Sequence, residues 1–175
     1  MDVDTSTMHT SLMHEDGACI LFDFTSAFPS ISQDFIHKVL AAIGTPPYVT
    51  NLISALYDNS YCRIKLNGKV GDPFCLKAGV RQGCPLSPMI YNVVTEILAD
   101  YLEHQCPRTL VRSYADDTAV VVEDIWSEGP TIANVFQEFK QISGLSLNLH
   151  KCVFIPLSPY NPDHAQRQIT QSIPT

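Results

Sequence analysis

The chain has 175 residues, the size of one domain or of one large part of a bigger one, so the sequence predicts a single hydrophobic core. Hydrophobic residues make up 45% of the chain and charged residues 17%, a balance that excludes a disordered protein. The formal net charge of -7 excludes a protein whose whole surface binds phosphate groups, so any nucleic-acid binding must be local or must use other parts of the polypeptide.

The cysteines and the apolar runs exclude two further classes of protein. The sequence has no Cys-x-x-Cys pair and no histidines at metal-ligand spacing, which argues against a structural zinc site. We therefore expect the cysteines to be small core residues of a protein in a reducing compartment. The six cysteines are Cys19, Cys62, Cys75, Cys84, Cys106 and Cys152. No run resembles an export signal or approaches the roughly 20 apolar residues that cross a bilayer, so we expect an intracellular protein, nuclear or cytoplasmic, without a membrane partner.

The first third of the chain predicts one strand and two helices. Residues 1–17 lack a hydrophobic period, and we expect an unstructured lead-in there. The apolar run Ala18–Phe24 predicts a buried strand with Asp23 near its end. Two amphipathic helices should follow, one capped by Ser30 or Ser32 and ended by Gly44, and one begun by Pro46 and Pro47.

The middle of the chain predicts a ribbon and a long helix. Polar and apolar residues alternate over Tyr61–Leu66, and the dipeptide Asn67-Gly68 that follows is a strong hairpin signal. Apolar residues then recur at helical spacing over Ser87–His104, which predicts a long helix with one face in the core.

A second hairpin is expected to carry acidic residues at its tip. Two short apolar strands, Leu110–Ser113 and Ala119–Val122, flank the tetrapeptide Tyr114–Asp117. A last helix should run from Pro130 to Gly144, and a strand should follow it.

The order of these elements predicts an α+β fold, in which a small antiparallel sheet packs its helices on one face. The proline-rich residues 157–175 predict a loop or a truncated continuation, so the folded part should be residues 18–156.

Three carboxylates are the strongest candidates for chemistry. Asp23 ends one strand and Asp116-Asp117 lie between two others, so all three can meet at one end of the sheet if the strands are neighbours. Carboxylates that lie so near one another either share protons or hold metal ions. A site of oxygen ligands without His or Cys suits Mg²⁺ or Mn²⁺. Two such ions about 3.5–4 Å apart serve in-line phosphoryl transfer. The alternative is that Asp-Asp is an ordinary turn dipeptide and that Asp23 merely ends a strand.

Four segments resemble, in the same order, motifs A, B, C and D of the reverse transcriptase palm. They are Asp23-Phe-Thr-Ser-Ala-Phe28, Arg81-Gln-Gly-Cys-Pro-Leu-Ser-Pro88, Tyr114-Ala-Asp-Asp117 and Gly144-Leu-Ser-Leu-Asn-Leu-His-Lys151. The second and third are more similar to the enzymes of non-LTR (LINE-type) retrotransposons than to those of retroviruses. The resemblance covers roughly residues 18–156 and implies a palm-like fold with an RNA-directed DNA polymerase activity.

The resemblance implies metal-binding and catalytic roles for five residues. Asp23 and Asp116 would hold both metal ions, Asp117 would complete the acidic cluster, and the main-chain carbonyl of Phe24 would add a ligand. Lys151 falls where the family has a lysine that protonates the leaving pyrophosphate, and its alternative role is that of a surface charge.

Five further residues would bind the nucleotide or the primer. Phe28 matches the aromatic that packs under the sugar and excludes a 2′-hydroxyl, against the alternative of a core aromatic. Gln82 and Gly83 would contact the incoming nucleotide. Arg81 would meet phosphate or template, unless it is a solvated loop arginine, and Tyr114 would lie beside the primer end, unless it is a buried tyrosine.

The resemblance also implies parts that this chain does not contain. The fingers that clamp the triphosphate and the thumb that grips the duplex are largely missing, and an endonuclease region is a further expected companion. The ligands would be Mg²⁺, deoxynucleoside triphosphates, an RNA template and a DNA primer. Two alternatives stay open: an inactive palm relic that persists as a binding module, and another polymerase of the same fold, such as an intron-encoded, telomerase-like or viral RNA enzyme.

Overall fold

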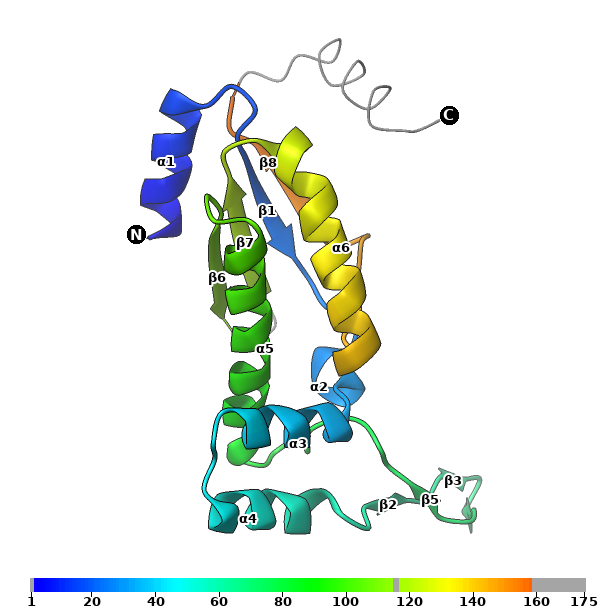
Figure 1. Cartoon of the computed structure of the whole chain (residues 1–175). Helices are drawn as coiled ribbons and strands as arrows, with labels where there is room; N and C mark the ends of the chain where they lie inside the picture. Colours follow the sequence, from blue (N-terminus) through cyan, green and yellow to red (C-terminus); the bar gives the residue numbers. More distant parts are fainter. Residues whose placement is uncertain (1, 115–116, 159–175) are drawn as a thin grey trace, which may run out of the picture.

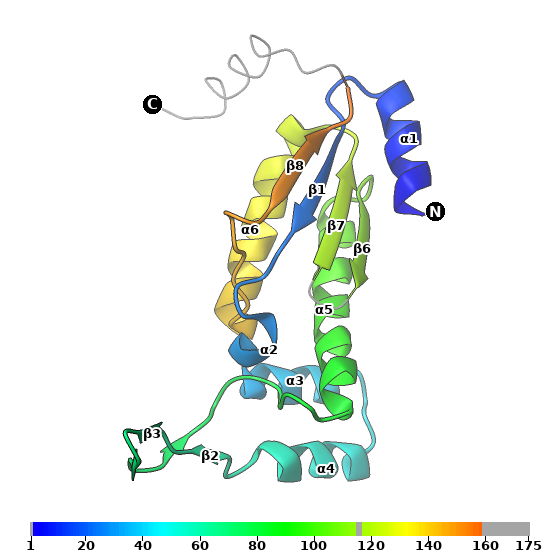
Figure 2. The same cartoon turned by 180° about the vertical axis from the view of Figure 1, so that it is seen from behind.

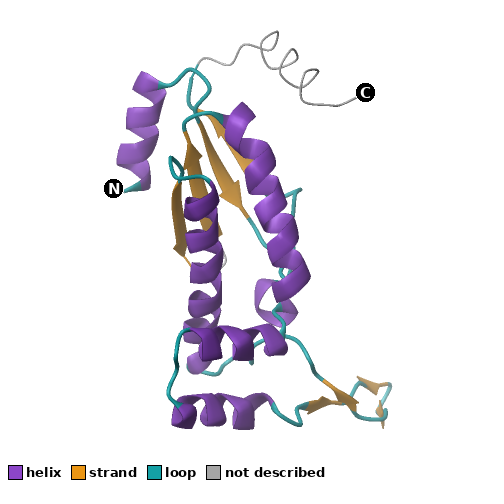
Figure 3. Cartoon of the chain, viewed as in Figure 1, coloured by secondary structure: helices purple, strands orange, loops and turns teal. Residues whose placement is uncertain are grey.

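A four-stranded antiparallel sheet forms the centre of the molecule, whose computed structural model describes residues 2–114 and 117–158 (Figure 1). The strands lie in the order β6-β7-β1-β8. Their bounds are Ala18–Phe22 for β1, Leu110–Tyr114 for β6, Asp117–Val122 for β7 and Val153–Pro156 for β8. Two long helices, α5 (Leu86–Gln105) and α6 (Ile125–Ser143), lie across one face of the sheet (Figure 3), which confirms the predicted α+β fold.

The core lies between this sheet and the two helices because side chains alternate along each strand. Ala18 and Phe22 of β1 point toward the helices and are buried, and the Phe22 ring lies 4.5 Å from the Phe136 ring of α6, centroid to centroid. Leu21 points to the opposite face and is exposed. Figure 2 shows this opposite face, most of which no helix of the described residues covers.

Three helices lie beyond one end of the sheet, between β1 and α5 in the sequence. They are α2 (Ala27–Ser30), α3 (Gln33–Ala42) and α4 (Pro47–Tyr57). The Ser32 hydroxyl accepts a hydrogen bond from the Phe35 amide at 3.3 Å, so Ser32 rather than Ser30 caps α3. Gly44 follows α3 with a φ of 71° and ends it as predicted.

The predicted unstructured lead-in, residues 1–17, is wrong, because Val3–Met13 forms the helix α1. The Asp2 side chain caps this helix, and α1 contacts β1, β6 and β7. The side chains that it buries are the polar Ser6 and Thr10, whereas its apolar Met8 is exposed. A helix that buries a polar face shows no hydrophobic period, so the sequence pattern missed it.

The helix predicted to open at Pro130 begins five residues earlier, at Ile125. Asp124 caps it by accepting hydrogen bonds from the amides of Trp126 and Ser127, at 3.0 and 3.2 Å. Pro130 therefore lies inside the helix, where its missing N–H leaves one helical hydrogen bond unmade. The local cap decides this start, and the proline is tolerated near it.

The predicted ribbon is confirmed as two short antiparallel pairs. β2 (Tyr61–Cys62) pairs with β5 (Phe74–Cys75), and β3 (Lys65–Leu66) pairs with β4 (Lys69–Val70). The turn between β3 and β4 has positive φ at both Asn67 (49°) and Gly68 (78°), as a type I′ turn requires.

The cysteines are free and only partly bear out the prediction of core residues. Cys19 and Cys106 are buried, and burial raises the pKa of both thiols. Cys152 is half-buried and packs against the core, whereas Cys75 is exposed and Cys62 and Cys84 are half-buried away from the core, so the prediction is wrong for these last three. Within the described part of the chain, no helix is long and apolar enough to cross a membrane.

Candidate active site

Asp23 and Asp117 lie at the same end of the four-stranded sheet. Phe22 and Thr118 form the last register pair between β1 and β7, and each aspartate stands one residue beyond that pair. Asp117 also pairs with Tyr114 across the β6–β7 hairpin. Asp116, the third acid expected here, lies outside the described residues. The prediction that the strands bring these acids to one end of the sheet is confirmed for the two that are described.

The segment after α6 runs alongside the segment after β1 and places Lys151. The Asn148 amide donates a hydrogen bond to the Asp23 carbonyl at 2.8 Å, and the Thr25 amide donates one to the Ser146 carbonyl at 2.8 Å. Phe24 and Leu147 form an antiparallel bridge between these two bonds. Motif A and motif D are therefore joined directly by backbone hydrogen bonds.

Gly144 makes this pairing possible. Its φ is 80°, and a Cβ atom at this position would lie 2.6 Å from the Ser30 carbonyl oxygen. Only glycine can turn the chain here so close to another backbone. The turn sends residues 145–151 back along motif A.

The Asp23 carboxylate faces a single described cation. Its Oδ2 atom lies 3.7 Å from the Lys151 Nζ atom, is buried, and has no hydrogen-bond partner among the described residues. A carboxylate oxygen removed from water without a donor is costly unless a cation compensates it. This oxygen fits a divalent ion better than a structural role.

The main chain of Phe24 offers a second oxygen at the same place. The hydrogen bonds to the neighbouring segment use the carbonyl of Asp23 and the amide of Thr25, so the Phe24 carbonyl points to the other side of the strand, away from Leu147. The Phe24 ring is buried, with its centroid 6.2 Å from that of Phe136. The ring therefore fixes the main chain that presents this carbonyl.

The structure describes no complete metal site. Within residues 2–114 and 117–158, no group of three or more His, Cys, Asp or Glu side chains lies close enough to hold a metal ion. The oxygens of Asp23, Asp117 and the Phe24 carbonyl are nevertheless of the ligand type that suits Mg²⁺.

Phe28 links motif A to motif B. Its ring stacks on the buried Tyr91 ring at 4.7 Å with an interplanar angle of 18°, and its carbonyl accepts a hydrogen bond from the Val80 amide at 2.8 Å. The Phe28 side chain is half-buried. A half-buried ring combines a packed face with an open edge, so both interpretations of Phe28 remain.

The loop Arg81–Gly83 presents polar groups to solvent. The Arg81 Nη2 atom donates a hydrogen bond to the Ser60 hydroxyl at 2.8 Å, and the Arg81 carbonyl accepts one from the Ser87 hydroxyl at 2.6 Å. Gly83 has a φ of 80° and open space around it, and Gln82 is exposed. No hydrogen bond or ion pair in the described part of the chain joins this loop to Asp23.

Tyr114 ends β6 and is 85% exposed. The alternative of a buried tyrosine is therefore wrong for this residue. Its register partner is Asp117, so its ring stands at the same end of the sheet as the acids.

Sequence reasoning missed three residues that hold this site together. Asn148 ties motif D to Asp23, Tyr91 supports the ring of Phe28, and Ser60 binds the Arg81 side chain. Tyr91 stands among the apolar residues of the predicted long helix, which marks it as buried, but no sequence signal shows what it packs against.

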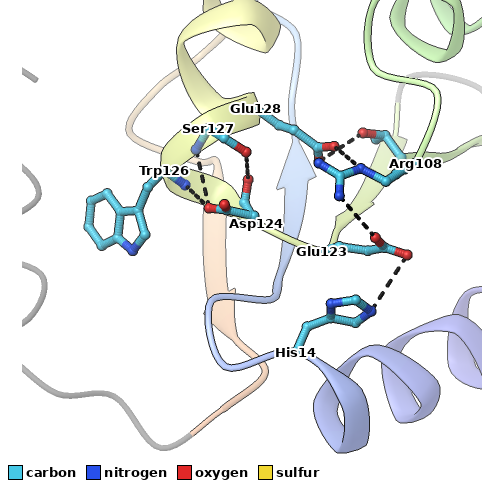
Figure 4. A network of polar contacts seen from close by, with 8 residues as sticks. His14, Arg108, Glu123, Asp124, Trp126, Ser127 and Glu128 are labelled. Carbon is cyan, nitrogen blue, oxygen red and sulfur yellow. Dashed lines mark hydrogen bonds and ion pairs between the residues drawn. The ribbon is translucent and has the colours of Figure 1, made fainter.

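A second acidic cluster lies at the opposite end of the sheet (Figure 4). The Glu128 carboxylate is buried, lies 3.7 Å from the Arg108 guanidinium and accepts a hydrogen bond from the Thr109 hydroxyl at 3.3 Å. Glu123 lies 3.8 Å from Arg108 and 3.6 Å from the imidazole of His14. Burial raises the pKa of Glu128, while Thr109 and Arg108 act to lower it.

The comparison with known families identifies the chain. The family model described as "Reverse transcriptase (RNA-dependent DNA polymerase)" matches residues 3–169. The chain belongs to the reverse transcriptase family. The match begins at Val3, the first residue of α1, so the matched segment includes this helix.

The relatives of this reverse transcriptase domain come from non-LTR retrotransposons. A Pol polyprotein from the type-1 retrotransposable element R2 of Popillia japonica is 28% identical over 79% of this chain and 21% of its own length. The R2DM polyprotein of Drosophila melanogaster is 28% identical over 74% of this chain and 13% of its own. The transposon TX1 149 kDa protein of Xenopus laevis is 26% identical over 62% of this chain and 9% of its own. The domain therefore spans less than a quarter of the length of these relatives.

Solved telomerase structures share the fold of this reverse transcriptase domain. Apo telomerase from Candida tropicalis superposes with a TM-score of 0.67 at 14% identity, over 87% of this chain and 30% of that one. Telomerase from Candida albicans in complex with a fragment of telomeric RNA gives a TM-score of 0.62 at 15% identity, over 88% of this chain and 31% of that one. At these identities the likeness shows the fold alone.

Proposed function

We propose that this chain is the catalytic palm of an RNA-directed DNA polymerase, which adds deoxynucleotides to a primer 3′-end by two-metal phosphoryl transfer. The observation that carries the proposal is the Asp23 carboxylate, whose buried Oδ2 atom lacks a hydrogen-bond donor and stands at the same sheet end as Asp117. The family description, an RNA-dependent DNA polymerase, supports the reaction and an RNA template, and the relatives from retrotransposable elements agree with it.

Four residues would hold the metal ions, Mg²⁺ or Mn²⁺. They are Asp23, Asp116, Asp117 and, through its main-chain carbonyl, Phe24. When bound, such ions lower the pKa of the primer 3′-hydroxyl and neutralise the charge that develops on the leaving pyrophosphate. The contribution of the chain is to fix these oxygens on a packed sheet before substrate arrives.

Lys151 has two roles in this proposal. Without metal, its ammonium group balances the Asp23 carboxylate at 3.7 Å. Its side chain is 67% exposed, so its ammonium group can move away from Asp23 toward a substrate. The Lys151 Nζ atom then donates a proton to the leaving pyrophosphate as a general acid.

The remaining residues would position the nucleotide and the primer. Gln82 and Gly83 bind the incoming nucleotide, where the open space around Gly83 lets the substrate approach the backbone. Arg81 meets phosphate or template, Tyr114 lies beside the primer end, and the open edge of Phe28 excludes the 2′-hydroxyl of a ribonucleotide.

Further parts of a longer polypeptide would supply the grip on the nucleic acid. Because the chain carries a net charge of -7, we expect it to show little or no processive primer extension by itself. A weak Mg²⁺-dependent single addition agrees with this expectation, and robust extension of oligo-dT on poly-rA contradicts it.

Metal binding tests the proposal directly on this chain. Isothermal calorimetry with Mn²⁺ should detect binding to the unmodified chain and its loss in Asp23→Asn. Asp34→Asn is the matched control, because Asp34 also pairs with a lysine, Lys38 at 2.6 Å, but lies exposed on α3. Equal binding by the unmodified chain and Asp23→Asn, or no binding by either, would contradict the assignment of Asp23 as a metal ligand.

A further inference from the structure

Residues 61–77, which we call the arm, project from the rest of the molecule. Figures 1 and 2 both show β2 and β3 beyond the end of α4, away from the four-stranded sheet. Every arm residue except Cys62 is exposed. The arm therefore stabilises itself by its own ladders and leaves its side chains available.

The arm exposes more apolar surface than a free ribbon requires. Six large apolar side chains are between 40% and 72% exposed. They are Tyr61, Ile64, Leu66, Val70, Phe74 and Leu76. Exposed large apolar side chains grouped in one short segment indicate an interaction site in a soluble protein.

The charge of the arm selects the kind of partner. The arm contains four of the eleven Lys and Arg residues of the chain and only one of its eighteen acids, Asp72. Its cations are Arg63, Lys65, Lys69 and Lys77. Among the described residues, none of these four is in an ion pair, whereas Lys38, Arg108, Arg112 and Lys151 all pair with carboxylates of the body. A cationic element on a chain of net charge -7 complements a polyanion.

The hairpin places a cation beside an aliphatic side chain on both of its faces. Lys65 is the register partner of Val70, and Leu66 is the partner of Lys69. Register partners in an antiparallel pair point to the same face. Each face therefore offers an ammonium group for a phosphate and an apolar surface for a base or a sugar, which is the combination that binds single-stranded nucleic acid.

The root of the arm is fixed to the loop of motif B. Ser60 precedes the arm, its hydroxyl accepts a hydrogen bond from Arg81, and its carbonyl accepts one from the Leu76 amide, both at 2.8 Å. The six residues from Tyr61 to Leu66 reach about 20 Å when extended. The arm thus begins beside the loop that carries Gln82 and Gly83, and its extended length matches a few nucleotides of a single strand.

We propose that the arm binds the single-stranded RNA template next to the nucleotide loop. This inference rests on the proposed function, because the template strand has to pass the loop at which the incoming nucleotide pairs. Lys65 and Lys69 bind phosphates on the two faces of the hairpin, and Val70 beside Lys65 and Leu66 beside Lys69 contact the bases or sugars.

Fluorescence anisotropy of the unmodified chain with a single-stranded RNA of about 12 nucleotides tests the arm without metal or nucleotide. Lys65→Gln/Lys69→Gln should weaken binding about tenfold at low salt and reduce the slope of log K against log salt by about 1.4, since each phosphate contact contributes about 0.7. Lys38→Gln/Lys140→Gln removes the same charge from the body and should leave the slope unchanged.

Three results would overturn the assignment of the arm. In the first, the unmodified chain fails to bind RNA, whether or not it binds DNA of the same sequence. In the second, the arm and body variants lose the same affinity for RNA. In the third, Leu66→Ser/Val70→Ser abolishes self-association in sedimentation while RNA binding is unchanged. The last result would make the arm a protein interface. All three leave Mn²⁺ binding at Asp23 untouched, so failure of the arm and failure of the proposed function are distinguishable.

Discussion

The two ends of the four-stranded sheet both gather carboxylates but treat them in opposite ways. At the end of β1, the Asp23 Oδ2 atom has Lys151 at 3.7 Å and no hydrogen-bond donor among the described residues. At the start of α6, Asp124 accepts two backbone amides, and Glu128 has both Arg108 and Thr109 as partners.

The partners of an acid therefore distinguish a ligand-binding carboxylate from a structural one better than the number of acids nearby does. Glu123, Asp124 and Glu128 are close in sequence, yet their partners belong to the protein itself: His14 follows α1, Arg108 lies between α5 and β6, and Asp124 caps α6 (Figure 4). Acids whose partners are supplied internally stabilise the fold. An acid left without a donor indicates that a ligand is to compensate it.

Replacing one acid at each end should give opposite results. In a polypeptide that also carries fingers and thumb, Asp116→Ala should reduce primer extension at least about 1000-fold, because it empties a metal site, while the melting temperature holds or rises as repulsion is relieved. Asp124→Ala should keep the activity and cost about 1 kcal/mol of stability by removing a helix cap. An Asp116→Ala enzyme that keeps a tenth of the rate would contradict the metal assignment.

Gly144 should be the most sensitive backbone position at the catalytic end. Gly144→Ala should lower the free energy of unfolding by about 2–3 kcal/mol, because the new Cβ atom meets the Ser30 carbonyl at 2.6 Å and φ is 80°. Gly44→Ala is the control: its φ is also positive, at 71°, but its Cβ atom would meet nothing within 4 Å, so about 1 kcal/mol is expected. Equal losses in urea unfolding would show that contact with Ser30 is unimportant.

Phe28→Val should separate packing from substrate choice. We expect a loss of stability of about 1–2 kcal/mol, less than for a fully buried phenylalanine, because the ring is only half-buried against Tyr91. Incorporation of ribonucleotides relative to deoxynucleotides should rise about tenfold or more in an active polypeptide, since the space beside the sugar opens. An unchanged ratio with a loss of more than about 3 kcal/mol would assign Phe28 to the core.

Glu128→Gln should have the smallest effect, confined to the pH dependence of stability at the opposite end. Since burial raises the pKa of Glu128 in the folded protein, its contribution to stability is complete below the ordinary glutamate value of 4.5 and is lost as pH rises through the folded pKa. The variant should not show this loss, so its melting temperature should fall less between acid and neutral pH.

Glu103→Gln is the control for this measurement, because Glu103 is 45% exposed and pairs with Arg112 at the surface. It should leave the pH profile unchanged. If Glu128→Gln melts lower than the unmodified protein at neutral pH, the ion pair with Arg108 outweighs the cost of burial.

Local patterns were enough to predict most elements, whereas the metal-binding candidates came from the resemblance to the reverse transcriptase motifs. β1, α3, α4, α5 and the turn at Asn67-Gly68 follow from apolar spacing and turn residues, which act over a few neighbouring positions. Patterns failed where the decisive contact is polar or distant: α1 buries Ser6 and Thr10, and the start of α6 depends on the cap formed by Asp124 rather than on Pro130.

By itself, the sequence determined which chemical groups are present: the acids, the lysine of motif D, the aromatic that ends motif A and the arm with its four cations. Only the tertiary structure decided which of them meet. The bridge between Phe24 and Leu147 brings Lys151 to Asp23, and the stacking of Phe28 on Tyr91 leaves that ring half open. Pairing between segments far apart in the chain depends on how the sheet and helices pack, because a hydrogen bond or a buried charge depends on distance in space and not on distance along the sequence.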